Sequence, residues 1–162
     1  MALEANRLSL LESVLGAVHV GAIVLDGAGR IVLWNRWMEQ YSAMPANEVL
    51  CREFYTLFPE MRSQRIGMAI QQALASNFPS LLSQTLNKSP FPLHADRAAA
   101  ERGERLQQAI AVTPVAVAGA ERHCLIQITD VSIAANREKV LREQAMVPVS
   151  YTHLTLPTSD LV

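Results

Sequence analysis

The chain has 162 residues, of which half are hydrophobic and 18% are charged, and its formal net charge is -1. This composition is typical of one globular domain with its own core, and it excludes a disordered chain. The near-zero net charge provides no field that would draw the chain onto nucleic acid or an anionic membrane, so we expect neither partner.

Cysteine and histidine usage gives no metal site. The two cysteines are Cys51 and Cys124, and no cysteine or histidine pair has the spacing of zinc ligands. Two distant cysteines without a secretory signal indicate a reducing, cytoplasmic location. Predominantly apolar stretches such as "VLGAVHVGAIVL" reach about a dozen residues, whereas a membrane-spanning helix needs about 20, so we predict no membrane segment in this chain.

The first predicted element is a flanking helix within residues 1–19. Leu8, Leu11, Leu15 and Val18 follow the spacing of one helical stripe. Met1, Leu8 and Leu15 are also one heptad apart. The stripe therefore has two interpretations: it packs on its own domain, or it forms the seam of a dimer.

A hairpin and a helix are predicted next. The strands cover Val20–Asp26 and Arg30–Trp34, joined through two glycines that can supply the positive φ of a tight turn. The side-chain oxygen of Asn35 can then cap the amides of a helix that begins at Arg36. We therefore assign Asn35 a structural role. The carboxylate of Glu39 lies near the start of the same helix, where the helix dipole favours a negative charge.

The middle of the chain predicts two helices, three strands and a loop. A short helix starts at Pro45, and a longer one contains Ile66 and Ile70, with Ser63 as its cap. Pro114 requires that its strand be an edge, bulged or interrupted. The stretch from Ser89 to Arg105, rich in prolines and charges, predicts a long mobile loop. The three strands are expected at 80–87, 105–117 and 123–131.

The last part divides into an exit helix at 133–147 and a tail at 148–162. In the helix, Ile133, Val140 and Val147 form a heptad series. The tail contains no Lys or Arg, and "VSYTHLTLPT" looks like translated sequencing-adapter read-through. We treat the tail as non-native, and we expect the natural chain to be a longer protein of which this is a truncated fragment.

At this point the chain resembles a PAS domain over Leu8 to Ala145. The resemblance depends on "VGAIVLDGAGRIVLWN" with Asn35 and Glu39, on "AMPANEVLC" with Cys51 where glycine is common, and on "LIQITDVS" before the exit helix. It implies an α+β fold over residues 20–132: a five-stranded antiparallel sheet with helices on one face, plus N-terminal and C-terminal flanking helices.

The same resemblance implies a function. PAS modules act in sensing or dimerisation in bacterial signalling, including two-component systems, usually upstream of a histidine kinase or a GGDEF-type diguanylate cyclase. We therefore expect a non-enzymatic sensory domain that relays a signal through its C-terminal helix to a missing output domain. Two alternatives stay open: a ligand-free dimerisation module, and a regulatory fragment of a truncated kinase or cyclase.

No catalytic residue set emerges from the sequence. It has no phosphate-binding glycine loop, no phospho-acceptor helix with an ATP-binding domain, and no GGDEF loop. Flavin-binding PAS relatives carry a reactive cysteine in "GxNCRFLQ", whereas Cys51 stands at the glycine position of "LCREFYTLF". Haem-binding relatives commonly use a histidine on the long helix, and Gln64–Ser76 contains none. A flavin adduct and haem are therefore not expected, and the cofactor stays unassigned.

Two further interpretations concern the core and the exit corner. Trp34, Trp37, Tyr55 and Phe58 are expected to pack in the core, with the lining of a ligand pocket as the alternative. Asp130 and Ser132 flank the junction of the last strand with the exit helix, where they can hydrogen-bond local backbone. We predict that these two residues couple the domain to its output. Partners are then a weak homodimer through the flanking helices and a downstream kinase or cyclase domain.

Overall fold

The computed structural model describes residues 2–146. The predictions on Met1, Val147 and the tail at 148–162 fall outside these residues. The helices are α1 (Ala2–Ala17), α2 (Arg36–Ser42), α3 (Ala46–Val49), α4 (Phe54–Leu57), the 3-10 helix η1 (Pro59–Ser63), α5 (Arg65–Ser76), α6 (Gln84–Asn87), α7 (Arg97–Glu101) and α8 (Ser132–Met146). The strands are β1 (Gly21–Leu25), β2 (Ile31–Trp34), β3 (Ser80–Leu82), β4 (Gln108–Val115) and β5 (His123–Asp130).

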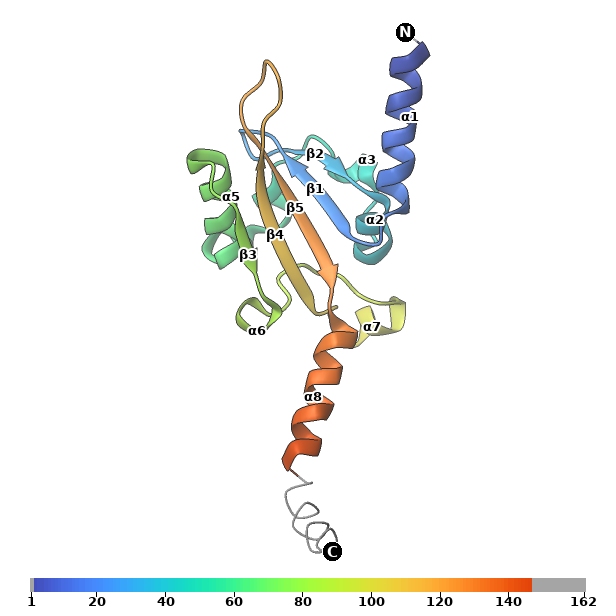
Figure 1. Cartoon of the computed structure of the whole chain (residues 1–162), viewed down its shortest axis with the longest axis vertical. Helices are drawn as coiled ribbons and strands as arrows, with labels where there is room; N and C mark the ends of the chain where they lie inside the picture. The colour runs from blue at the N-terminus through green and yellow to red at the C-terminus, as the bar shows by residue number, and fades with distance from the viewer. Residues whose placement is uncertain (1, 147–162) are drawn as a thin grey trace, which may run out of the picture. The chain divides into compact units, whose positions relative to one another are not determined.

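The strands form one five-stranded antiparallel sheet in the order β2-β1-β5-β4-β3 (Figure 1). The last strand, β5, lies in the centre and pairs with the first strand, β1, over Gly21–Leu25. It pairs with β4 along its whole length, from His123 to Asp130. The predicted fold class, α+β with an antiparallel sheet and flanking helices, is confirmed.

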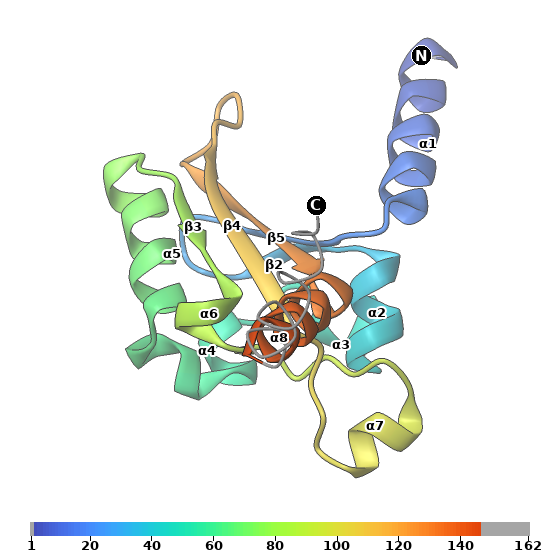
Figure 2. The same cartoon turned by 60° about the horizontal axis from the view of Figure 1, so that its bottom comes forward.

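The core lies between the sheet and the helices that cover one of its faces, α2 to α5 (Figure 2). Alternate strand residues face this layer, as the period of two requires. In β5 these are Cys124, Ile126 and Ile128, all with no exposed surface. Helix α5 meets them with Ile66, Ala69, Ile70 and Ala73.

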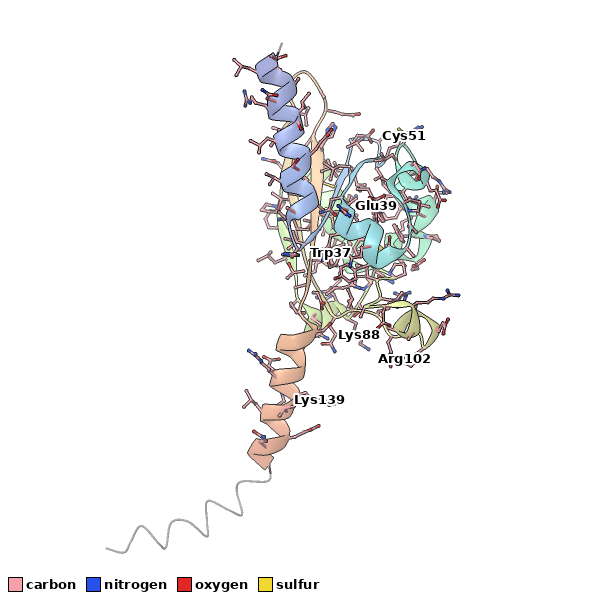
Figure 3. The ribbon with its side chains drawn as sticks, turned by 90° about the vertical axis from the view of Figure 1, so that its right-hand side faces the viewer. Trp37, Glu39, Cys51, Lys88, Arg102 and Lys139 are labelled. Carbon is pink, nitrogen blue, oxygen red and sulfur yellow. The ribbon has the colours of Figure 1, made fainter. Side chains whose placement is uncertain are left out.

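The flanking helices differ from this layer. Helix α1 approaches the covering helix α2 only near its C-terminal end (Figure 3), and none of its described residues is buried. Helix α8 belongs to a separate unit that begins at Val131, so we describe it by itself. Its Val140 and Leu141 are 48% and 64% exposed. The side chain of Ile133 lies outside the described part.

Two predictions for the middle of the chain were wrong in part, and two short helices were missed. The strand expected at 80–87 stops at Leu82, and Gln84–Asn87 forms α6 instead. Ser63 does not cap α5; the N-cap is Gln64, and the Ser63 hydroxyl donates to the Glu60 carbonyl within η1. Short helices carry little amphipathic signal of their own, which is why α4 and η1 were missed.

The segment from Ser89 to Arg105, predicted as a loop, contains α7 and two buried anchors, Phe91 and Leu93. The side-chain amide of Gln108, fully buried on β4, pairs with the Phe91 backbone. It accepts from the Phe91 N–H at 3.0 Å and donates to the Phe91 carbonyl at 2.8 Å. The segment is therefore tied to the sheet.

Candidate functional site

The strand-to-helix corner at Asn35 is the most densely bonded polar site on the N-terminal side of the domain. Asn35 is 6% exposed and is the N-cap of α2. Its side-chain oxygen accepts from the Met38 N–H at 3.2 Å, which is the capping bond that the sequence predicts. The same oxygen accepts from the Ala22 N–H at 3.0 Å.

The second of these bonds explains how a strand can turn directly into a helix. The Asn35 N–H donates to the Ala22 carbonyl, as in a regular strand pair. The Asn35 carbonyl, however, accepts from the Glu39 N–H in the first turn of α2. Its side-chain oxygen therefore replaces that carbonyl opposite Ala22, and both β1 and α2 keep their bonds.

The side-chain nitrogen of Asn35 reaches in the other direction along the chain. It donates to the Val20 carbonyl at 2.9 Å and to the Leu15 carbonyl at 3.3 Å. Leu15 is in the last turn of α1, where helix carbonyls lack regular partners. One amide thus binds the end of α1, the entry to β1 and the start of α2.

Close packing reinforces this corner. A Cβ at Gly21 would meet the Met38 sulfur at 2.6 Å and the Trp37 ring at 2.8 Å, so α2 approaches β1 at a distance that only glycine permits. Glu39, labelled on α2 in Figure 3, accepts from the Ala46 N–H at 2.8 Å. It therefore holds the start of α3 in addition to its place in the first turn of α2.

An open groove of about 770 Å³ lies between α1 and this corner. The side contributed by α1 consists mainly of small and polar residues, among them Ser13, Gly16 and Ala17. The opposite side is formed by β2, the start of α2 and Leu50. The groove is thus bounded by the same helix end that Asn35 binds.

The aromatic residues singled out in the sequence lie in the core. Trp34, Trp37 and Phe58 are buried, and Tyr55 is half-buried against them. The Phe58 ring lies 5.2 Å from Phe54, 5.6 Å from Phe91 and 6.4 Å from Trp34, measured between centroids. These distances are those of packed aromatic pairs, so the rings fill space between the sheet and the covering helices. All four side chains thus belong to the core or pack against it, and Trp34 also lines the groove beside α1.

The two cysteines have opposite environments. Cys51 is exposed, and its φ of 68° lies in the left-handed region, which agrees with the frequent glycine at this position in the family motif. Its N–H donates to the Ile31 carbonyl at 2.8 Å. Cys124 is buried, and burial raises the pKa of its thiol to about 12. At neutral pH Cys124 is therefore a protonated, unreactive thiol.

The exit corner joins the end of β5 to the start of α8. Asp130 is the last residue of β5, is exposed, and lies opposite Gln108 in the register with β4. Ser132 is the first residue of α8 and is half-buried. Along the chain, Val131 alone separates the strand from the helix.

Within the described residues, no group of three or more histidine, cysteine or acidic side chains could hold a metal ion. None of the helices in the same part of the chain is long and apolar enough to cross a bilayer.

The family model for the PAS fold matches residues 9–140. The chain belongs to the PAS family. PAS domains are in general non-catalytic sensory modules. No curated protein matches the sequence.

Solved structures similar to this PAS domain are themselves PAS domains of signalling proteins. A sensory box sensor histidine kinase from Vibrio cholerae has a TM-score of 0.55 at 21% identity, covering 81% of this chain and 95% of that one. The PAS domain of BvgS from Bordetella pertussis has a TM-score of 0.57 at 16% identity, covering 90% and 98%. The PAS domain of nitrogen regulation protein NR(II) from Vibrio parahaemolyticus has a TM-score of 0.52 at 15% identity, covering 75% and 97%. At these identities the likeness shows the fold.

Sequence reasoning missed Gln108 and the wider role of Asn35. Gln108 stands at an inward position of an apolar strand, and such an isolated amide is the signal that a buried backbone group needs a partner. The extra bonds of Asn35 join residues up to 20 positions apart, which become neighbours only when the hairpin folds.

Proposed function

We propose that this PAS domain is the sensory part of a cytoplasmic bacterial signalling protein and relays a signal through α8 to an output domain. The observation that supports the relay most directly is the junction of β5 with α8. Strand β5 is central in the sheet, and a single residue separates it from the helix. A shift in the sheet can therefore pass into the helix without being absorbed by a linker.

In this proposal Asp130 and Ser132 are positioning residues at the exit corner, and a histidine kinase or a diguanylate cyclase is the downstream partner. The domain has no catalytic role of its own. Its cysteines suit a reducing compartment, since Cys51 is a free exposed thiol. The structural neighbours from histidine kinases favour the kinase over the cyclase.

The test is Asp130→Ala in the full-length protein, with its natural C-terminus in place of residues 148–162. Removing one local hydrogen bond costs about 1 kcal/mol, which a domain of this size survives, whereas allosteric coupling is typically only about 1–3 kcal/mol. We expect a folded protein with reduced signal-dependent output.

The matched control is Asp96→Ala. Asp96 caps α7, and its side chain accepts from the Ala99 N–H at 2.7 Å, so this change removes a comparable bond far from the exit corner in sequence. Output that suffers equally in both variants, or normal output from the Asp130 variant, would contradict the coupling role.

A second candidate function is a dimerisation module without a ligand. The aromatic rings packed between the sheet and the covering helices favour it, because they occupy space that a core ligand would need. A native mass spectrum of the unheated protein distinguishes the two. A co-purified small molecule supports ligand sensing, and the mass of the bare chain supports the second candidate.

Both candidates include a homodimer through the flanking helices. The exposed leucines of α1 support this part of the proposal, and sedimentation over a concentration series tests it. Because α1 has only 16 residues, we expect weak association. Protein that stays monomeric up to near-millimolar concentration would contradict it.

A further inference from the structure

The edge of the sheet is stepped where β3 ends. Strand β3 stops at Leu82, opposite Ile110 of β4, and the chain then turns away into α6 (Figure 1). Two hollows adjoin this step. One, of about 280 Å³, lies beside the start of α5. The other, of about 390 Å³, lies on the sheet face opposite the core and is lined there by Ala109, Ala111, Gln127 and Thr129.

The two hollows are parts of one groove that passes around the end of β3. They share four lining residues: Arg65, Leu82, Leu86 and Asn87. We call the two hollows together the β3-end groove. Because it lies at the edge and on the outer face of the sheet, it is separate from the aromatic core between the sheet and the covering helices.

One half of the β3-end groove is apolar and uncovered. Leu81 and Leu86 are 86% and 66% exposed, and both line the hollow on the outer face of the sheet. Ala109 and Ala111 extend this apolar surface across β4. Large exposed leucines beside a hollow are typical of a surface that an apolar ligand covers, since covering them removes apolar area from water.

The other half carries one uncompensated positive charge. Arg65 lines both hollows, is exposed, and takes part in no ion pair among the described residues. No acidic side chain lines either hollow. The groove beside α1 differs, because Glu12 and Arg36 both line it and their charges balance. The charge of the β3-end groove therefore complements an anion.

The position of Arg65 in α5 supports the same conclusion independently. Arg65 is the first residue of α5, where the helix dipole favours a negative charge, and the first turn contains no acidic residue. The N-cap residue, Gln64, makes no side-chain hydrogen bond to this turn. An arginine at an uncapped helix start goes against local preference, and such departures are expected at functional sites. A bound anion satisfies both the guanidinium and the helix start.

We propose that the β3-end groove binds an amphiphile with one alkyl chain and one carboxylate. The carboxylate lies on Arg65 at the start of α5, and the chain lies across Leu81 and Leu86. A guanidinium pairs with a carboxylate through two parallel hydrogen bonds, and the two charges cancel. A phosphate monoester carries roughly two negative charges at neutral pH, which one arginine leaves partly uncompensated.

This inference goes beyond the proposed relay through α8. Gln127 and Thr129 belong to β5, the strand that leads to the exit corner, so a ligand in the groove contacts that strand. Binding itself does not require the relay, however. A failure of the relay and a failure of binding are therefore distinguished by separate measurements.

The experiment titrates the full chain with decanoate below its micelle concentration and follows backbone amide signals by NMR. We expect the shifts to concentrate at Ala109, Ala111, Gln127 and Thr129. Octanoate should bind roughly fivefold more weakly, because its chain is two methylenes shorter. Decyltrimethylammonium has the same chain length and the opposite charge, so we expect no binding at the groove.

Two variants test the two halves of the groove. Arg65→Gln should raise the dissociation constant of decanoate roughly tenfold, since it removes a charge-assisted pair. Leu86→Ser should also raise it, with Arg65 intact. Arg52→Gln is the matched control, because Arg52 is exposed and lines neither hollow, and it should leave binding unchanged. Near-ultraviolet circular dichroism from Trp34 and Trp37 checks that each variant is folded.

Several results would overturn the inference. Decanoate that produces no shifts, or that binds equally well to the folded Arg65→Gln variant, excludes the carboxylate site. Shifts centred on Phe54, Phe58 and Phe91 place the ligand in the aromatic core instead. Association with vesicles of anionic phospholipid that is stronger than decanoate binding, and that is lost in Arg65→Gln, assigns the groove to a membrane surface rather than to a free ligand.

Discussion

Helices α1 and α5 show that the apolar content of a helix does not by itself determine whether the domain buries it. Helix α5 turns one side to the sheet and buries Ile66, Gly67, Ala69, Ile70 and Ala73. Helix α1 has more leucines and buries none. The difference is one of arrangement: α5 lies in the layer that covers the sheet, whereas α1 stands beside the Asn35 corner with its leucines uncovered. One helix contributes to the core, and the other leaves Leu3, Leu8, Leu10 and Leu11 exposed.

The largest expected effect is on the buried side of this comparison. Ile70 is 2% exposed on α5, so Ile70→Ala leaves a cavity against the sheet. We expect it to lower the free energy of unfolding by about 2–5 kcal/mol, measured by denaturant titration. Met68→Ala is the control on the same helix, because Met68 is 62% exposed, and it should change stability by less than about 0.5 kcal/mol. Equal effects in the two variants would mean that α5 is not packed as described.

The next largest effect is expected at Asn35, whose side-chain amide connects α1 to β1 and α2. Asn35→Ala removes the cap of α2 and leaves the Ala22 N–H and the Val20 carbonyl without their partner. We expect a loss of roughly 2–3 kcal/mol in unfolding free energy. Asn87→Ala is the control, since Asn87 makes one exposed side-chain bond, to the Ser83 carbonyl. A loss of unfolding free energy for Asn35→Ala no greater than for Asn87→Ala would show that the Asn35 bonds stabilise the fold no more than an exposed side-chain bond does.

The stability of the buried core is also expected to depend on pH, through the thiol of Cys124. Burial raises the pKa of Cys124 to about 12, above its value near 8.5 in an unfolded chain. Between these values the unfolded state loses the proton and the folded state keeps it. Stability therefore falls as pH rises through this window, by up to about 1.4 kcal/mol per pH unit. Cys124→Ala should flatten that slope in denaturant titrations between pH 8.5 and 10.5, and Cys51→Ser should not.

The smallest effect on stability is expected on α1. Leu11 is 56% exposed, so Leu11→Ala should change the unfolding free energy by less than about 0.5 kcal/mol. The same change should weaken self-association in sedimentation, because Leu11 lies in the proposed seam. A large loss of stability at low protein concentration would show that Leu11 packs on its own domain.

The sequence predicted the hairpin and the Asn35 cap because these depend on local chemistry: glycine at a turn and an amide before a helix. Gly29 indeed has a φ of 82°. The segment from Ser89 to Arg105 was misjudged because its prolines and charges mask Phe91 and Leu93, whose burial depends on distant Gln108. The resemblance supplied the family. The glycine that is common at position 51 of the family motif agrees with the positive φ of Cys51.

The candidate site was less accessible to sequence reasoning. Asn35 was found for one bond, and its bonds to Leu15, Val20 and Ala22 exist only because folding brings the end of α1 beside the hairpin. The roles of Asp130 and Ser132 come from position and stay predictions. The leucine spacing of α1 left packing on the domain and a dimer seam both open, and the exposure of these leucines could be learned only from the structure.

Pro114 has a consequence for the behaviour of the folded protein in concentrated solution. Strand β3 pairs with β4 only as far as Val112, although β4 continues to Val115 and pairs with β5 throughout. The last residues of β4 thus form a short stretch of unpaired sheet edge, of the kind onto which a strand from another molecule can add. Proline at position 114 lacks the N–H that such an added strand would need. Pro114 is therefore expected to disfavour the addition of a strand at this edge, and with it aggregation.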